Sequence, residues 1–173
     1  YVNDSEIKGY ADKVDFKIGN LKFDGTNVTV KNGVYAGGLP VKPQVLVQFG
    51  GKTLEEGKDY KITVDTYTDV TTKAVYSIII DGLNGYKGSI ATSSAPSAAS
   101  THIPTWGIDK QTIANCDVTV KDGKAVVLNG TVRVPESEYT VTKNADDTYT
   151  VAAKSTSKNY TGSKTVKADG KAE

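Results

Sequence analysis

The stretch VTVKNG at residues 28–33 recurs 90 positions later as VTVKDG at residues 118–123. Two more motifs recur in the same order: DYKIT at 59–63 returns as EYTVT at 138–142, and YKGS at 86–89 returns as YTGS at 160–163. Three matches in one order indicate that a small β-rich unit was duplicated. Tandem modules of this kind usually form spacers or binding surfaces, so the repeat favours a non-catalytic function.

The offset in residue number between matching motifs falls along the chain, from 90 to 79 and then to 74. Taking Gly130 as the partner of Gly51, the fall from 90 to 79 is predicted to reflect the loss of the stretch 34–44 from the second copy. The fall from 79 to 74 is predicted to reflect a loss between Tyr60 and Tyr86. The second copy is therefore predicted to be a trimmed version of the first.

Composition and charge argue against two kinds of partner, nucleic acid and a membrane. The 173 residues carry a formal net charge of +1, and Arg133 is the only arginine. Nucleic-acid binding needs a basic surface, so we expect no nucleic-acid partner. No stretch has the apolar length of a membrane span, so we expect no membrane insertion. Because the chain has no Met and begins at Tyr1, we expect it to be a fragment of a longer protein.

Apolar and polar residues alternate in short runs, and no segment has a helical period. Strands are expected at 45–49, 60–64, 74–80, 125–128 and 139–142, separated by turns rich in Gly and Asn-Gly. The run 74–80 is the most apolar and is predicted to be a central strand with Val75 or Tyr76 in the core. Short strands at this spacing predict an all-β protein made of two antiparallel β-sandwiches in line.

The expected domains follow the repeat. We expect a lead-in or the remnant of a preceding module at 1–12, a first module at 13–91, a Ser/Ala/Pro-rich linker at 92–101, and a shorter second module at 102–173. Trp106 and Ile108 occupy the places that Phe16 and Ile18 hold in the first copy.

The order of motifs in the first copy is specific. Tyr35-x-Gly37 and Pro43 precede an apolar strand, GKTLEEGKDY follows at 51–60, and GLNGYKG follows at 82–88. This order resembles the bacterial immunoglobulin-like repeats of large Gram-positive cell-surface proteins, many of them from gut Firmicutes. The match covers about residues 28–90. The second copy keeps EY at 138–139 and NYTG at 159–162 and is a degenerate member.

The resemblance implies two tandem immunoglobulin-like β-sandwich modules at the bacterial cell surface or cell wall, outside the cell. The leading hypothesis is a non-catalytic, monomeric segment that acts in adhesion and protein binding, or as a spacer between neighbouring modules of the parent chain. One alternative is a dedicated, superantigen-like receptor for a host glycoprotein such as an immunoglobulin. Another is an accessory carbohydrate-binding module of a large secreted enzyme, with a glycan as partner. The sequence leaves these open.

Three side chains are candidate ligand contacts. Tyr35 and Leu39 lie in the stretch that the second copy lacks, and Trp106 lies beside the expected linker. A core position is favoured for Trp106, because it replaces Phe16. The repeated motif residues are interpreted as structural: Asp59, Tyr60, Tyr86, Gly88, Tyr139, Tyr160 and Gly162.

Few residues carry catalytic chemistry. His102 is the only histidine and lies at the expected linker, so we predict no Ser-His-Asp unit. Cys116 is the only cysteine, which excludes an internal disulfide and a Cys-rich metal site. The oxygen ligands Asn144, Asp146 and Asp147 share one loop, and a hairpin turn is favoured there over a calcium site. We therefore predict no catalytic residue, no cofactor and no metal.

Overall fold

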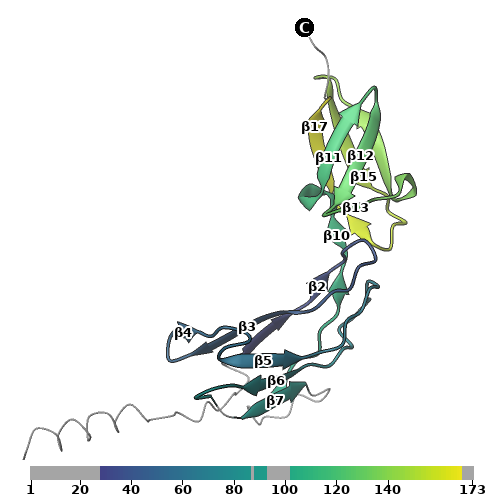
Figure 1. Cartoon of the computed structure of the whole chain (residues 1–173). Coiled ribbons are helices and arrows are strands. Elements are labelled where there is room, and N and C mark those ends of the chain that lie inside the picture. Colours follow the sequence, from purple (N-terminus) through teal and green to yellow (C-terminus); the bar gives the residue numbers. More distant parts are fainter. Residues whose placement is uncertain (1–27, 87, 93–101, 169–173) are drawn as a thin grey trace, which may run out of the picture. The chain divides into compact units, whose positions relative to one another are not determined.

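The computed structural model describes residues 28–86, 88–92 and 102–168 (Figure 1). The expected lead-in at 1–12, the positions of Phe16 and Ile18, and residues 93–101 of the expected linker lie outside the described residues. Described residues form short strands and two 3-10 helices, η1 (Ile113–Asn115) and η2 (Glu136–Glu138). This described part of the chain is all-β with mainly antiparallel sheets, as the alternation predicted. No helix among the described residues is long and apolar enough to cross a membrane.

By their contacts the residues form two compact units. Among the described residues, the first takes 28–30, 45–64, 77–86, 88–92 and 102–105, and the second takes 31–44, 65–76 and 106–168. The second unit therefore combines two stretches of the first sequence copy with the second copy.

The first unit contains two sheets. One has the strand order β1-β3-β4, formed by β1 (Val28–Lys31), β3 (Gln44–Phe49) and β4 (Lys52–Thr53). The other has the order β5-β6-β7-β8, formed by β5 (Tyr60–Thr63), β6 (Ile79–Gly82), β7 (Ser89–Thr92) and β8 (His102–Ile103). Buried side chains alternate along these strands, with Val47 and Ile80 at 0 % exposure. This alternation is the period-2 pattern of half-buried strands.

The expected strand at 74–80 is wrong in its bounds. Strand β6 begins only at Ile79, and the side chain of Val75 is 50 % exposed. Val75 and Tyr76 belong to the second unit, where both backbone amides donate to the carbonyl of Trp106. Apolar composition alone could not reveal this long-range pairing.

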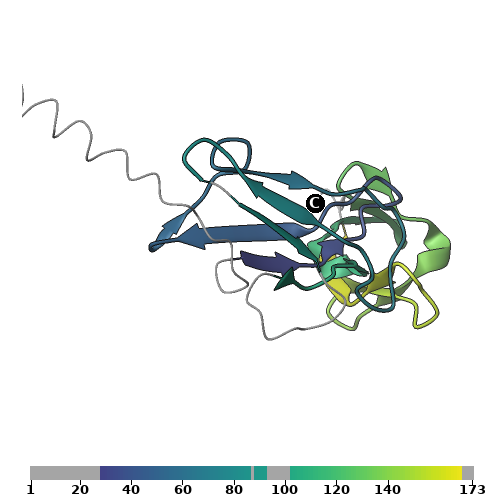
Figure 2. The same cartoon turned by 90° about the horizontal axis from the view of Figure 1, so that it is seen from below.

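The second unit has two three-stranded antiparallel sheets around one core. The first has the order β11-β12-β13, formed by β11 (Asp117–Lys121), β12 (Lys124–Asn129) and β13 (Val132–Arg133). The second has the order β14-β15-β17, formed by β14 (Tyr139–Lys143), β15 (Thr148–Ala153) and β17 (Ser163–Lys167). The long strands lie side by side in Figure 1, and Figure 2 looks along them from one end. Val120, Val127 and Val151, from three of these strands, are 0 % exposed in the shared core.

Two parallel pairings complete the second unit. Strand β10 (Gln111–Thr112) pairs with β16 (Tyr160–Thr161). Strand β2 (Gly33–Val34), from the first copy, pairs with β9 (Ile108–Asp109).

Backbone hydrogen bonds correct the register between the two copies. Leu54 N donates to Val47 O, and Val134 N donates to Val127 O, both at 2.9 Å. These bonds are equivalent, and both partners are offset by 80 in residue number, so Gly130 matches Gly50, not Gly51 as the sequence suggested. Two glycines in a row left the motif comparison ambiguous by one position.

The structure also changes where the second copy is shorter than the first. Ile62 pairs with Ile80 in the first copy, whereas Val141 pairs with Val151 in the second. The offset between the copies is therefore 79 at the first strand of this pair and 71 at the second. It returns to 74 at Tyr160, so the connection between these strands is trimmed more than the motif spacing suggested. The spacing of the sequence motifs gave only the net change in length between Tyr60 and Tyr86.

Candidate functional site

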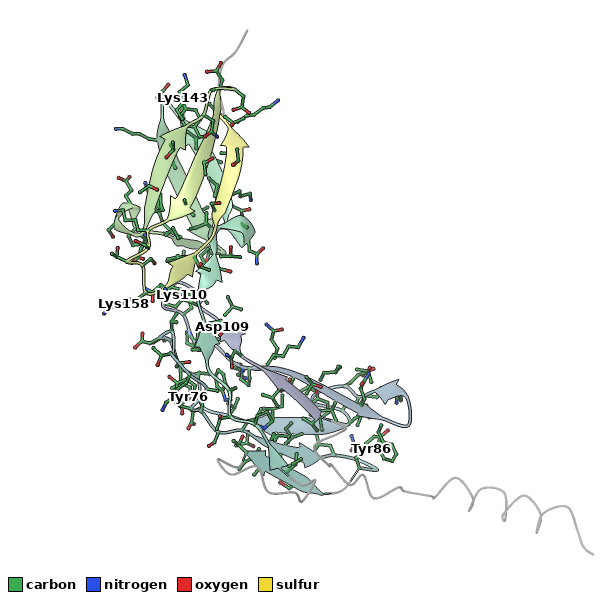
Figure 3. All side chains as sticks on the ribbon, turned by 180° about the vertical axis from the view of Figure 1, so that it is seen from behind. Tyr76, Tyr86, Asp109, Lys110, Lys143 and Lys158 are labelled. Atoms are coloured by element: carbon green, nitrogen blue, oxygen red, sulfur yellow. The ribbon has the colours of Figure 1, made fainter. Side chains whose placement is uncertain are left out.

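In the second unit, the extended segment 106–109, which ends in β9 (Ile108–Asp109), lies between two segments of the first copy, 31–35 and 71–76. We name these two flanking segments the strand slot. Such addition of an extended segment to exposed backbone is a recurring mode of peptide recognition. Tyr76, on one side of the slot, and Asp109, on the strand, are labelled in Figure 3.

The segment 31–35 pairs in parallel with the strand. Gly33 N donates to Gly107 O at 3.0 Å, and Tyr35 N donates to Asp109 O at 2.9 Å. The side chain of Asn32 adds two bonds: its Oδ1 accepts from Gly107 N at 2.8 Å, and its Nδ2 donates to Asp109 Oδ1 at 2.9 Å. This side of the slot therefore contacts both the backbone and one carboxylate of the strand.

The segment 71–76 holds the other edge. Thr71 N donates to Ile108 O at 3.0 Å, and Thr71 Oγ1 accepts from Ile108 N at 3.0 Å. Val75 N and Tyr76 N each donate to Trp106 O at 2.9 Å, and Trp106 N donates back to Tyr76 O at 3.1 Å. Residues 106–109 therefore have backbone hydrogen bonds on both edges, like the central strand of a small sheet.

The indole of Trp106 is 0 % exposed and sits in an aromatic cluster. The rings of Tyr67 and Tyr76 stack at a centroid distance of 3.5 Å with an interplanar angle of 3°. Trp106 is tilted against both, at 5.9 Å from Tyr67 and 5.1 Å from Tyr76. The structure thus places this candidate ligand contact in the interior, the position that its match with Phe16 favoured.

Gly107 lies where the strand passes closest to the slot. A Cβ at this position would lie 2.3 Å from Thr71 Oγ1 and 3.2 Å from Lys73 O. Any side chain would overlap these atoms, so the slot admits only glycine without rearrangement. Sequence reasoning missed Gly107, Asn32 and Thr71, because their partners lie more than 30 positions away along the chain.

Tyr35 packs into the second unit. Its ring meets that of Tyr160 edge-on at a centroid distance of 5.5 Å, and its carbonyl accepts from Asn129 Nδ2 at 2.8 Å. Burial raises the pKa of the Tyr35 phenol, and the nearby carboxylates of Glu138 and Asp69 raise it further. Tyr35 is only half-buried.

Leu39, the other candidate in this stretch, is presented to solvent. Its side chain is 49 % exposed, on a turn closed by Leu39 N donating to Ala36 O at 3.4 Å. Gly37 and Gly38 both have positive φ, 73° and 93°, and a Cβ on Gly37 would lie 2.7 Å from Val132. The glycines therefore let the loop lie against β13 while Leu39 faces outward.

The repeated motif residues Asp59 and Tyr60 are buried beside a turn of the first copy. Asp59 is 6 % exposed, and its Oδ2 accepts from Glu55 N at 3.0 Å. Tyr60 is 4 % exposed, with a phenol pKa raised by burial and by the carboxylates of Glu56 and Asp59. Gly57 has a φ of 83°, a backbone conformation that favours glycine.

The repeated tyrosines of the second copy are also buried. Tyr139 is buried and donates its hydroxyl to Ala125 O at 3.0 Å, as expected of a core anchor that reaches the backbone. Tyr160 is 3 % exposed.

The turns before the last strands are alike in both copies. Gly88 and Gly162 have φ of 112° and 68°, and each accepts a 2.9 Å bond, from Gly82 N and Ala153 N respectively. Tyr86, half-buried, meets Phe49 edge-on at 6.3 Å.

Cys116 is 1 % exposed, and its Sγ donates to Thr112 O at 3.6 Å. Burial raises the thiol pKa above its ordinary value, and this effect exceeds the opposing one of Lys164. A raised pKa disfavours the thiolate, which is the nucleophilic form. His102, the only histidine, lies in β8.

The loop of Asn144, Asp146 and Asp147 forms a hairpin turn. Asp146 Oδ1 accepts from the hydroxyl of Thr148 at 2.6 Å and from its backbone N at 3.1 Å, which lowers the pKa of that carboxyl. Asp147 pairs with Lys143 at 3.1 Å. Over residues 28–86, 88–92 and 102–168, no three His, Cys, Asp or Glu side chains group as metal ligands.

A cavity of about 250 Å³ opens beside the edge strand β14. Its lining residues are Gly123, Lys124, Ala125, Glu136, Tyr139 and Val141. No sequence pattern pointed to this cavity, because its walls come from β12, η2 and β14.

No protein-family model matches this chain, and neither a curated protein nor a solved structure matches it.

Proposed function

We propose that this chain is a non-catalytic binding segment of a bacterial cell-surface protein, built from immunoglobulin-like β-sandwich modules. The observation that carries the proposal is that the buried polar side chains bond within the fold. The buried polar side chains, Asp59, Asn129 and Ser157, bond to turns or strands of the fold itself. Burial also holds the Cys116 thiol in its less reactive form. Polar side chains that bond to turns and strands stabilise the loops, and loops held by a rigid scaffold commonly carry binding residues.

Leu39 is the contact residue that we propose for a protein partner. A glycine turn holds it 49 % exposed within the stretch that the first copy has and the second lacks. Exposed aliphatic side chains on structured loops supply the apolar centre of many protein interfaces. The partner class is a host protein, with an immunoglobulin or another glycoprotein as the first choice.

The test is binding of the full chain to immobilised serum proteins, immunoglobulins and mucosal glycoproteins, with a glycan array alongside. Leu39→Asp should abolish saturable binding, whereas Leu46→Asp, at a 41 % exposed position on β3, should preserve it. Binding that survives Leu39→Asp would contradict the role of this loop. Absence of binding to all of the immobilised proteins would contradict the protein-binding function. Binding to glycans alone would favour a carbohydrate-binding module.

A spacer is the second candidate, and the strand slot favours it. Residues 106–109 are bonded on both edges to segments of the first copy, and Trp106 is fully buried. A spacer must stay folded under tension, and pulling on this part of the chain would have to break these bonds together. Single-molecule stretching of the full chain should show a force peak that Trp106→Ala lowers. An unchanged peak would remove this support.

A further inference from the structure

The two flanking segments of the strand slot overlap the two places where the first copy is longer than the second. Between β1 and β3 the first copy carries the stretch 34–43, where the second copy has only the tight turn at 122–123 between β11 and β12. Between β5 and β6 the first copy carries 64–78, where the second has 144–147 between β14 and β15. One side of the site, 71–76, lies within an extra stretch of the first copy. The other side, 31–35, leads into an extra stretch, with Asn32 and Gly33 at positions where the second copy has Asp122 and Gly123.

The site contacts four consecutive residues, each in a different way. Trp106 enters the cluster of Tyr67 and Tyr76, and Gly107 passes where no Cβ fits. Ile108 is 0 % exposed, and the carboxylate of Asp109 accepts from Asn32 Nδ2. The slot thus reads an aromatic residue, a glycine, a buried aliphatic residue and an aspartate, in that order.

The chain contains a second segment with an aromatic residue and isoleucine at the same spacing. In the repeat register, Phe16 and Ile18 match Trp106 and Ile108, but Lys17 stands at the position of Gly107. Gly19 stands at the position of Asp109. A lysine would overlap Thr71 Oγ1, and a glycine offers no carboxylate to Asn32, so this second segment fails two of the four requirements.

We infer that the strand slot is a sequence-selective acceptor for an extended segment of the pattern aromatic-Gly-aliphatic-Asp. Trp106 to Asp109 of the same chain fill it, and a segment with the sequence Phe-Lys-Ile-Gly does not meet its requirements. Selection of this kind rests on steric exclusion as well as attraction. It determines which β-module is able to follow the first copy, independently of any host ligand.

The binding test uses the full chain carrying Trp106→Ala, which weakens its own strand and removes its only tryptophan. Three peptides are added: PTWGIDKQ, the sequence of residues 104–111; the same peptide with Gly107→Lys; and VDFKIGNL, the sequence of residues 14–21. Burial of the peptide indole reports binding of the first two, and competition against the first reports the third. We expect PTWGIDKQ to bind at least about tenfold more tightly than the others, since steric overlap of this size typically costs that much or more.

Equal affinities for the three peptides would overturn the inference. So would binding of PTWGIDKQ that is unchanged when Asn32→Ala is added, because the slot would then not read the aspartate.

A second measurement keeps the inference testable if the Trp106→Ala chain does not fold. In the otherwise unaltered chain, Gly107→Ala should expose Trp106, seen as a red-shifted emission and faster quenching by iodide. Gly85→Ala is the matched control, since a Cβ there meets nothing within 4 Å and φ is not positive. Trp106 emission that responds equally in both variants, or in neither, would overturn the inference.

Discussion

Trp106→Ala is the sharpest test of how the second unit is held together. The indole is 0 % exposed, and it contacts the rings of Tyr67 and Tyr76 at 5.9 and 5.1 Å. Truncating a fully buried aromatic side chain to alanine costs about 3–5 kcal/mol. The two ring contacts contribute about 0.5–1.5 kcal/mol each to that total, beyond the burial of area.

The assay is native-state hydrogen exchange of the full chain, because two units make one global unfolding free energy ill-defined. Amides of the slot, such as those of Tyr35, Tyr76 and Ile108, report local opening of the site. A loss of about 3 kcal/mol corresponds to exchange about a hundredfold faster. Amides that pair β6 with β7 in the first unit should keep their protection.

Trp106→Phe supplies the matched control, since phenylalanine is the residue at the corresponding position of the first copy. It keeps an aromatic ring in the cluster, so slot amides should accelerate far less than in the alanine variant. The reasoning is refuted if slot amides of a folded Trp106→Ala chain exchange less than about tenfold faster, below the roughly 1.4 kcal/mol that a factor of ten represents.

Three further predictions concern single groups. Tyr139→Phe removes the bond to Ala125 O and should lower the free energy of opening of the second unit by about 1–3 kcal/mol, measured by native-state hydrogen exchange at its core amides, because a buried carbonyl loses its donor; no change would contradict the anchor role. Burial raises the pKa of Tyr60 and Tyr160 above 10.0, so the stability that this shift contributes is complete below about pH 10 and is lost as pH rises through the folded pKa. A tyrosinate absorbance titration checks this, and a folded midpoint at or below the unfolded one would refute it. Cys116, buried and with a raised pKa, should react with a thiol reagent only as the second unit opens, and a reaction as fast in native as in denatured protein would contradict that.

Local patterns predicted the β architecture well. The alternation at 60–64 and 139–142 became β5 and β14, with Tyr60 and Tyr139 buried at their starts. Gly57, Gly88 and Gly162 took positive φ at turns, because a left-handed backbone conformation favours glycine strongly enough to be read from one position. The repeat also pointed to Trp106 as a core residue.

The strand slot could not be found in the same way. Asn32, Thr71 and Gly107 have no unusual local context, and their side-chain hydrogen bonds span 37 to 77 positions. The run 74–80 read as one central strand, yet Tyr76 pairs with Trp106 in the second unit. The choice between such pairings depends on which backbone groups meet in space, and periodicity carries no record of that.

By itself the sequence determined the short-range features of this protein: an all-β chain, a duplicated unit, the tyrosine anchors and the glycine turns. These depend on side-chain alternation and backbone conformation within a few positions. Only the tertiary structure decided that stretches 31–44 and 65–76 of the first copy join the second unit and hold residues 106–109. That outcome rests on steric fit at Gly107 and on hydrogen bonds between distant segments, which exist only once the chain has folded.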